Sequence, residues 1–179
     1  MVAQQIGFAS ATYGIKKIKI NMRFDKTHED WHGHLKRVEG LGKRLALEMK
    51  ICMWGAMAGN LAWEMCKIVG RNGRVWAQEP DSSWTKQAKD LFVIPNLIWC
   101  DKSDIQRPDW NSCDLCVIDW VPHGGDLVVL EQIQDWSILD TVRSIMTEQH
   151  DEHIQSWMDD HGFSLAPDSV KYHTWWDKK

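Results

Sequence analysis

The sequence predicts an α/β fold in which helices cover both faces of a doubly wound, mainly parallel β-sheet. Short apolar segments alternate with segments of helical periodicity between residues 49 and 165, a pattern typical of parallel sheets. Residues 115–120 are apolar almost throughout, as expected for a central strand that is buried on both faces. No internal repeat and no Pro/Gly/Ser-rich linker divides the chain. We therefore expect one domain over residues 45–179, preceded by an N-terminal segment, residues 1–44, as a candidate lid or partner surface.

Composition and charge limit the functional classes. The 179 residues are 44% hydrophobic and 26% charged, which is typical of a globular domain. The chain has 21 Lys and Arg against 25 Asp and Glu, a net charge of -4, so we expect no nucleic-acid partner. No apolar stretch approaches the roughly 20 residues that span a bilayer, and the first basic residues follow the apolar N-terminal stretch, the reverse of a secretory signal. These features predict a cytoplasmic protein without membrane contact.

The N-terminal segment contains two predicted elements. Residues 15–20, IKKIKI, alternate apolar and basic side chains, which favours an edge strand with its lysines in solvent over a phosphate-binding patch. Residues 29–47 carry apolar side chains three or four positions apart, which predicts a helix that is broken near Gly40 or Gly42.

The first βαβ unit of the predicted domain follows. The apolar run 49–54 predicts a strand that enters a turn of small residues, 55–59. Residues 60–69 place apolar side chains on one helical face and end at a glycine, which is typical of a helix C-terminus. Residues 74–79 predict a second strand, which ends on an acidic residue.

The same alternation continues to the end of the predicted sheet. In chain order it predicts a helix over 84–92 capped by Ser82 or Ser83, a strand over 97–100, a strand over 115–120, a helix beginning at 127–132, a strand over 142–146, a helix over 153–161 and a final strand beginning at 163–165.

Twelve tryptophans are the one unusual feature of the composition. Four of them lie in apolar periodic segments and are expected in the core, as is usual for large aromatic side chains: Trp63, Trp76, Trp99 and Trp120. The terminal Trp175 and Trp176 stand beside charged residues, and we interpret them as a candidate contact surface.

Cysteine and histidine clusters raise the question of a metal site. The five cysteines are expected to be reduced, since all but Cys113 lie in apolar runs. Cys113 and Cys116 form a C-x-x-C and, with Cys100, are zinc candidates, but without a second pair at zinc-finger spacing a structural role is favoured. His150 and His153 are candidates to share a helix face and a transition metal, yet their acidic neighbours favour a solvated helix. We expect no metal.

The turn at residues 55–59 is the predicted ligand site, because ligands of such sheets bind beyond the carboxyl ends of the strands. Its small residues allow close approach of a ligand to the backbone, and the following helix directs its amides toward that ligand. Glu79 ends the second strand, where a carboxylate can accept hydrogen bonds from ribose hydroxyls. Asp101 follows the third strand and is positioned to border a base. The pattern favours a nucleoside-containing ligand over an empty structural turn.

These residues also carry a resemblance to a known family. The segment ICMWGAMAGNLAWEMCKIVGRNGRVWAQEPDSSW resembles the cofactor-binding start of class I S-adenosylmethionine (SAM)-dependent methyltransferases, and the likeness continues through CDLCVID and GGDLVVLEQIQDW to HGFSL. The strand ending in Ile-Asp, followed by Gly, a small residue and an acid, is similar to the FkbM-like branch. The resemblance covers about residues 45–165. It implies a Rossmann-like doubly wound fold and S-adenosylmethionine as cofactor.

The resemblance also implies roles for single residues. Gly55, Ala56 and Gly59 would face the methionine part of the cofactor, Glu79 the ribose and Asp101 the adenine edge. Two positions depart from the family pattern, which has an acid where this chain has Met53 and an Asn or Gly where it has Met57. A methionine requires more energy than a glycine to enter left-handed backbone conformations.

The sequence therefore predicts a SAM-dependent methyltransferase that acts on a hydroxyl of a small molecule or glycan. Asp119 and His123, at and after the end of strand 115–120, are the candidate catalytic bases. The alternatives are a helix-capping role for Asp119 and a solvated loop position for His123. A catalytically inactive binding or assembly protein of the same fold is the competing interpretation. The methyl acceptor and the oligomeric state are left open.

Overall fold

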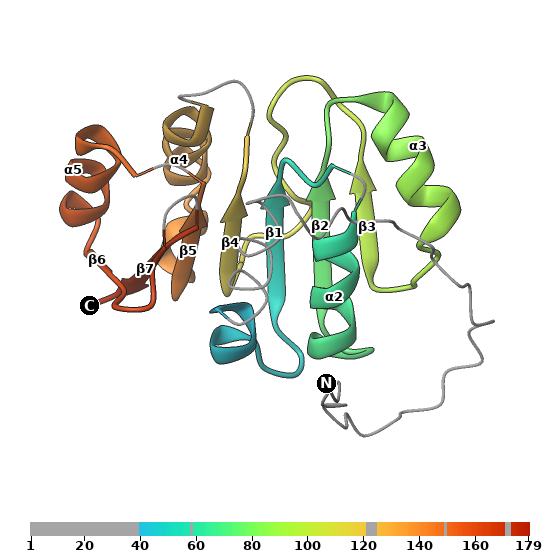
Figure 1. Ribbon diagram of the computed structural model, residues 1–179, viewed down its shortest axis with the longest axis horizontal. Helices are drawn as coiled ribbons and strands as arrows, with labels where there is room; N and C mark the ends of the chain where they lie inside the picture. The colour runs from blue at the N-terminus through green and yellow to red at the C-terminus, as the bar shows by residue number, and fades with distance from the viewer. Residues whose placement is uncertain (1–39, 58, 121–124, 149, 171–172) are drawn as a thin grey trace, which may run out of the picture.

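The computed structural model describes residues 40–57, 59–120, 125–148, 150–170 and 173–179 (Figure 1). The strand predicted over 15–20 lies outside the described residues, as does most of the helix predicted over 29–47. Of that helix, residues 40–47 are described, and residues 40–44 are helical whereas 45–47 are not. The predicted break does not occur at Gly42, because a single glycine inside a helix costs only about 1 kcal/mol.

A seven-stranded sheet forms the centre of the molecule. Its strands are β1 (Lys50–Trp54), β2 (Arg74–Gln78), β3 (Leu97–Cys100), β4 (Leu115–Ile118), β5 (Ser144–Thr147), β6 (Phe163–Leu165) and β7 (Thr174–Lys178). They are arranged in the order β3-β2-β1-β4-β5-β7-β6 (Figure 1). Strands β1 to β5 pair in parallel, whereas β7 is antiparallel to both of its neighbours. The strand order reverses between β1 and β4, so the carboxyl ends of these two strands mark the expected ligand crevice.

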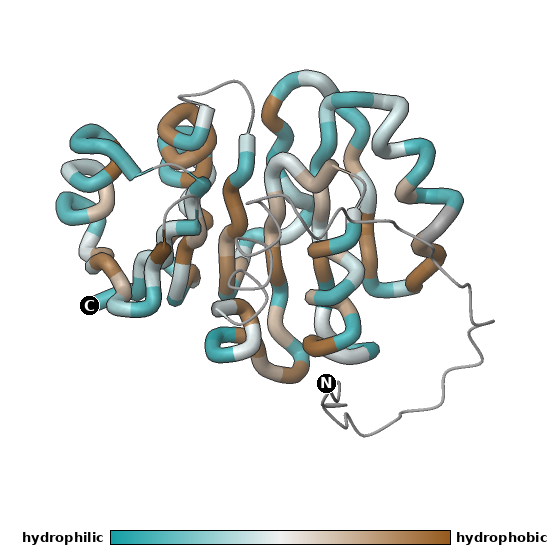
Figure 2. The backbone as a smooth tube through the Cα atoms, viewed as in Figure 1, coloured by the Kyte–Doolittle hydropathy of each residue, from teal (hydrophilic) through white to brown (hydrophobic). Residues whose placement is uncertain are grey.

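Helices cover both faces of this sheet, as predicted. They are α2 (Asn60–Val69), α3 (Ser82–Leu91), α4 (Gly125–Asp135), the 3-10 helix η1 (Ile138–Asp140) and α5 (Glu152–Asp160). Along β1, Ile51 and Met53 belong to the core shared with α2 and α3, whereas Cys52 and Trp54 belong to the core shared with α4, η1 and α5. Both faces of β1 are thus buried, which explains why its sequence is apolar without alternation. All four residues of β4 are buried as well, and Figure 2 shows that β4 is hydrophobic along most of its length, whereas α3 and α5 are largely hydrophilic.

The helix ends follow local sequence signals. Gly70 caps α2 at its C-terminus with φ 70°, as predicted. At the start of α3, however, the N-cap is Asp81, whose side chain accepts a hydrogen bond from Ser83 N at 2.8 Å. The prediction of Ser82 or Ser83 as the cap is wrong, because both residues already lie inside the first helical turn and the Asp81 carboxylate reaches the amide of Ser83.

The terminal tryptophans belong to the core. Trp175 and Trp176 are 1% and 0% exposed in β7, and each of them packs on a different face of the sheet. The interpretation of this pair as a contact surface is therefore wrong. It failed because β7 inserts between β5 and β6, a pairing of distant segments that no local pattern reveals.

The four tryptophans expected in the core behave in two ways. Trp76 and Trp120 are 3% and 8% exposed, which confirms their prediction. Trp63 and Trp99 are half-buried and pack against the core of the α2 face.

Residues 40–44 attach to the C-terminal part of the chain. The Arg44 guanidinium donates to Asp168 at 2.8 and 3.0 Å and to Asp177 at 2.9 and 3.0 Å. It also lies 4.4 Å from the centre of the Trp175 ring, and a Cβ added to Gly40 would lie 2.3 Å from that indole. This short helical segment is therefore packed closely on β7 and on the loop before it.

Candidate functional site

The turn between β1 and α2 is held to the end of β2 by backbone hydrogen bonds. The amides of Gly55 and Ala56 both donate to Gln78 O, at 2.9 and 3.0 Å, and Gly59 N donates to Ala56 O at 2.8 Å. The turn therefore lies at the carboxyl edge of the sheet, where the sequence predicted a ligand site.

The two glycines of this turn make room for other parts of the protein. Gly55 has φ +82°, and a Cβ there would lie 1.8 Å from the backbone oxygen of Asp119. Gly59 has φ +80°, and a Cβ there would lie 2.4 Å from the Trp99 ring. Both positions need glycine for its backbone freedom and for its small size. As a result, the ends of β3 and β4 approach the turn closely.

Met57 adopts the left-handed conformation that its sequence position suggested, with φ 46°. Its side chain is 53% exposed, and its backbone amide donates to Glu79 Oε2 at 2.6 Å. Met53, the other departure from the family pattern, is 2% exposed and belongs to the core of the α2 face. The amide of Met57 thus links the turn directly to the carboxylate of Glu79.

Glu79 connects the turn to the start of α3. Its side chain is 6% exposed, and its second oxygen, Oε1, accepts a hydrogen bond from Asp81 N at 2.9 Å. Two charge-assisted hydrogen bonds compensate for burial of this carboxylate. Because a carboxylate has about four acceptor positions, two remain for further donors.

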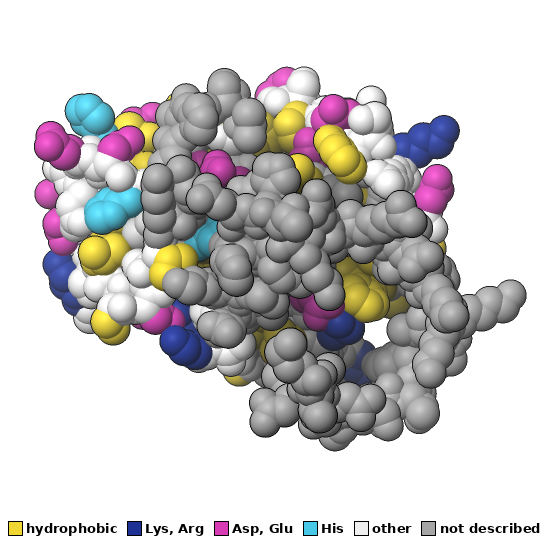
Figure 3. All heavy atoms as spheres, viewed as in Figure 1, with side chains coloured by type: hydrophobic (Ala, Val, Ile, Leu, Met, Phe, Trp, Pro, Cys, Tyr) yellow, Lys and Arg dark blue, Asp and Glu magenta, His cyan; other side chains and the backbone are white. Residues whose placement is uncertain are grey.

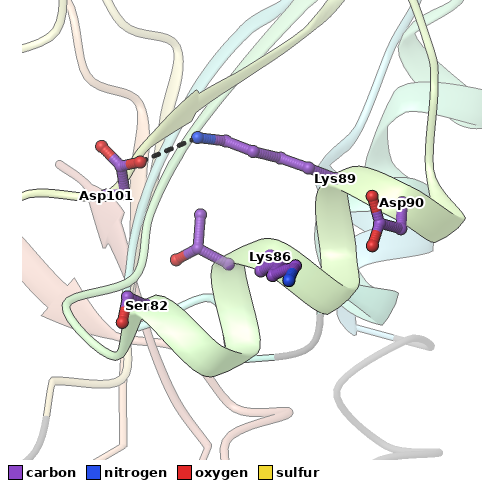
Figure 4. A pocket seen from close by; sticks show the side chains of 6 residues that line it. Ser82, Lys86, Lys89, Asp90 and Asp101 are labelled. Carbon is purple, nitrogen blue, oxygen red and sulfur yellow. Dashed lines mark hydrogen bonds and ion pairs between the residues drawn. The ribbon is translucent and has the colours of Figure 1, made fainter.

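Asp101 follows β3 at the same edge of the sheet. It is adjacent to the end of β2, since Glu79 N donates to Cys100 O at 3.1 Å. Its exposed carboxylate forms an ion pair with Lys89 of α3 at 2.9 Å (Figure 4). The hydrogen bond and the charge of the Lys89 ammonium lower the pKa of Asp101.

An open cavity of about 270 Å³ lies beside this ion pair. It is lined by Ser82, Thr85, Lys86, Lys89, Asp90 and Asp101, and Figure 4 shows Lys89 reaching across it toward Asp101. Lysines and aspartates both line the cavity, so it does not select one sign of ligand charge.

Of the two candidate bases, Asp119 is among the described residues. Asp119 directly follows β4, is half-buried, and donates its amide to Trp54 O at 2.9 Å. Its backbone carbonyl borders Gly55, so Asp119 lies at the predicted site. His123 lies outside the described residues.

Neither histidines nor cysteines form a metal centre in the part of the chain that the structure describes, where no group of three His, Cys, Asp or Glu side chains is arranged to hold a metal ion. Figure 3 shows acidic and histidine side chains gathered at the left edge, the position of α5 in Figure 1.

Within the same described ranges, no helix is both long enough and apolar enough to span a membrane.

Several solved structures with a similar fold are methyltransferases. The chain is similar to Aeropyrum pernix fibrillarin with natively bound S-adenosyl-L-methionine (TM-score 0.58, 14% identity, 80% of this chain and 73% of that one). It is equally similar to a TehB-like SAM-dependent methyltransferase from Corynebacterium glutamicum (TM-score 0.58, 15% identity, 84% and 95% of the chains). A third is magnesium protoporphyrin IX methyltransferase from Synechocystis with bound SAM (TM-score 0.58, 15% identity, 83% and 81%). The chain has the class I methyltransferase fold. No protein-family model and no curated protein matches the sequence.

Two residues that the sequence analysis did not identify support the site in this methyltransferase fold. Gln78 is fully buried at the end of β2, donates to the carbonyls of Lys102 and Asp104 at 2.8 and 2.6 Å, and accepts from Gln106 N at 2.9 Å. It thereby fixes the loop that follows Asp101. A polar residue within an apolar strand was the available signal, since a buried amide must find partners.

The second is Asp126, which is fully buried in the first turn of α4. Its carboxylate accepts a hydrogen bond from Trp120 N at 3.2 Å, next to Asp119. The α4 N-terminus favours a negative charge at this position. Asp126 therefore holds the chain where it leaves β4.

Proposed function

We propose that this protein is a SAM-dependent methyltransferase of the FkbM-like type that methylates a hydroxyl of a small molecule or glycan. One observation carries the proposal: the buried Glu79 carboxylate accepts a hydrogen bond of 2.6 Å from the Met57 amide of the β1–α2 turn. The chain shares its fold with two structures that contain SAM. We place the reaction in the cytoplasm, because all five cysteines are free thiols.

The residues around the turn fit a nucleoside cofactor with a carboxylate end. The two remaining acceptor positions of Glu79 suit a pair of ribose hydroxyls. Gly59, the N-cap of α2, provides no side-chain hydrogen bond to the helix, so the first-turn amides and the helix dipole favour an anion there. Gly55 and Ala56 keep the intervening backbone free of bulky side chains. When bound, SAM supplies an electrophilic methyl group on its sulfonium.

Asp101 is proposed to contact the adenine edge. The Lys89 ion pair uses Oδ2 of Asp101, which leaves Oδ1 as an acceptor for an exocyclic amine. Asp101 would therefore bind the base without losing its ion pair.

Asp119 and His123 are the proposed bases for an acceptor hydroxyl. Asp119 is fixed through its own backbone and, by way of Trp120, through Asp126. Such a carboxylate can orient the hydroxyl and take up its proton as the methyl group is transferred. The rest of the rate enhancement would come from alignment of the acceptor with the methyl group.

A second candidate function is binding without catalysis. The amides of Gly55, Ala56, Met57 and Gly59 are all bonded within the protein, and both carboxylates proposed for the cofactor already have protein partners. A site whose polar groups already form hydrogen bonds within the protein gains less binding free energy from a ligand.

Titration calorimetry with SAM and S-adenosylhomocysteine separates the two functions. We expect binding by the unchanged chain, and an affinity loss of roughly tenfold or more for Glu79→Gln, because one charge-assisted bond contributes about 1.5 kcal/mol or more. Glu131→Gln is the matched control, since Glu131 is exposed on α4. Thermal unfolding of each variant verifies that it is folded.

Two results would contradict the methyltransferase proposal. Absence of heat with both ligands at millimolar concentration would favour the binding protein. Equal affinities of Glu79→Gln and Glu131→Gln would show that the ligand lies elsewhere.

A further inference from the structure

Three buried thiols lie together at the far side of the sheet from α2. Cys52 and Cys116 are paired positions in β1 and β4, and Cys113 precedes β4 by two residues. All three belong to the core shared with α4 and α5, with exposed fractions of 0%, 0% and 1%. The proposed methyl transfer uses none of them.

The sulfur atoms of Cys113 and Cys116 lie close together but are not bonded. Their Sγ atoms lie 3.8 Å apart, whereas a disulfide needs about 2.05 Å. The backbone of Cys113 is fixed, because its amide donates to Thr141 Oγ1 at 2.8 Å and the same hydroxyl lies 3.0 Å from Cys113 O. Cys116 is fixed by pairing in β4. For a disulfide to form, the two sulfurs must therefore approach each other by rotation of their side chains.

The three thiols are chemically different. Burial opposes ionisation of Cys113, but hydrogen bonds from the thiols of Cys116 and Cys52 lower its pKa. Burial raises the pKa of Cys52 and of Cys116. A readily ionised thiol beside a protonated one is the arrangement in which the first attacks an oxidant and the second resolves the product.

We propose that Cys113 and Cys116 are a redox-active dithiol that a peroxide oxidises to a disulfide. The Cys113 thiolate attacks one peroxide oxygen, which forms a sulfenic acid and releases hydroxide. The Cys116 thiol then displaces the sulfenic oxygen as water and forms the S–S bond, while the hydroxide takes up the proton that Cys113 had lost. Two thiols and one hydrogen peroxide thus give one disulfide and two waters, with two electrons passing from sulfur to peroxide.

Burial determines the class of oxidant. Hydrogen peroxide is close to water in size, whereas a bulky disulfide such as oxidised glutathione requires an exposed thiol. Cys100 is half-buried, so exposure alone would favour its modification over that of the buried pair.

The test treats the reduced full-length chain with hydrogen peroxide and blocks the remaining thiols in denaturant with N-ethylmaleimide. We expect the mass to fall by two hydrogens, three thiols to remain, and peptide mapping to place the disulfide between Cys113 and Cys116. Oxidised glutathione should give no adduct on either residue. A disulfide that includes Cys52, first oxidation at Cys100, or a glutathione adduct on Cys113 would overturn the proposal.

Serine variants test the assigned order of events. With Cys116→Ser, the sulfenic acid on Cys113 should persist after peroxide treatment of the folded chain and be trapped by dimedone added together with denaturant, whereas Cys113→Ser should yield no disulfide and no trapped adduct on this pair. Cys66→Ser is the control, because Cys66 is buried on the opposite face of the sheet, and it should oxidise like the unchanged chain. If Cys113→Ser fails to fold, Cys116→Ser still decides: when it is oxidised while folded and then denatured with dimedone, absence of the Cys113 adduct contradicts the proposal.

Discussion

At Gly55 the backbone oxygen of Asp119 occupies the space that any side chain would need. This contact brings the end of β4 to the turn after β1, and so positions a candidate base beside the candidate cofactor turn. Met57 in the same turn carries a left-handed conformation that costs about 1–2 kcal/mol for a residue with a Cβ. The hydrogen bond from its backbone amide to the buried Glu79 carboxylate offsets this cost, because charge-assisted hydrogen bonds contribute about 1.5–3 kcal/mol.

Substitution of two glycines separates steric overlap from backbone strain. Gly162→Ala should lower the free energy of unfolding by about 1 kcal/mol, because Gly162 has φ +78° and nothing within 4 Å of an added Cβ. Gly55 has a similar φ, and the Cβ of Gly55→Ala would also overlap the backbone oxygen of Asp119. We therefore expect the free energy of unfolding to fall by about 3 kcal/mol or more. Urea unfolding measures both. Equal losses would show that the close approach of Asp119 is not required.

The sequence predicted most elements but only part of the site. Strands β1 to β4 and helices α2 and α3 were accessible, because their apolar runs, glycine stops and turns are local signals. The turn with Gly55 and the acid Glu79 was accessible for the same reason. The partners of Gly55 and Glu79 were not, since a contact with Asp119 or with the amide of Met57 depends on how separate strands meet.

Strand β7 shows where local sequence patterns fail to predict an element. Its sequence, TWWDK, reads as a mixture of aromatic and charged side chains, and its burial depends on the neighbours β5 and β6. A polar contact anchors it: Trp176 Nε1 donates to Thr147 Oγ1 of β5 at 3.0 Å, with both groups buried.

Loss of this hydroxyl should destabilise the sheet. Thr147→Val keeps the shape of the side chain but leaves a buried indole N–H without its acceptor, so we expect the free energy of unfolding to fall by about 1–3 kcal/mol. Thr147→Ser retains the acceptor and should cost less. Chemical denaturation compares the two variants. If serine destabilises as much as valine, packing rather than the hydrogen bond attaches β7 to β5.

For the whole molecule, Arg44 joins the described start of the chain to its end. Its side chain is only 9% exposed and contacts Asp168 and Asp177, which lie 124 and 133 positions further along the chain. Ser144 of β5 also donates to Asp177 at 2.6 Å, so the guanidinium, β7 and β5 form one connected network. Because β5 is a neighbour of β4 in the sheet, this network supports the strand that carries Asp119.

Removal of the guanidinium should therefore lower stability in a way that depends on pH. Arg44→Met keeps an apolar stem on Trp175 but leaves two carboxylates without their main partner. We expect a loss of about 2–3 kcal/mol at pH 7, at or below the roughly 3–5 kcal/mol of fully buried pairs, because Asp177 is 43% exposed. Lys43→Met is the matched control: Lys43 also contacts Asp168, at 3.0 Å, but is 62% exposed, so its loss should cost less than about 1 kcal/mol.

The pH dependence follows from Asp168, because the hydrogen bond from Arg44 holds the pKa of Asp168 well below its usual range. A carboxyl with a lowered pKa in the folded state stabilises the protein above its unfolded pKa, about 3.9, and loses that contribution as pH falls toward the folded value. The difference in unfolding free energy between the unchanged chain and Arg44→Met should thus be constant from about pH 7 to 5 and shrink below about pH 4. Urea titrations across this range measure it. Parallel curves for the two proteins down to the acid limit would mean that Arg44 contributes through packing on Trp175 rather than through its charge.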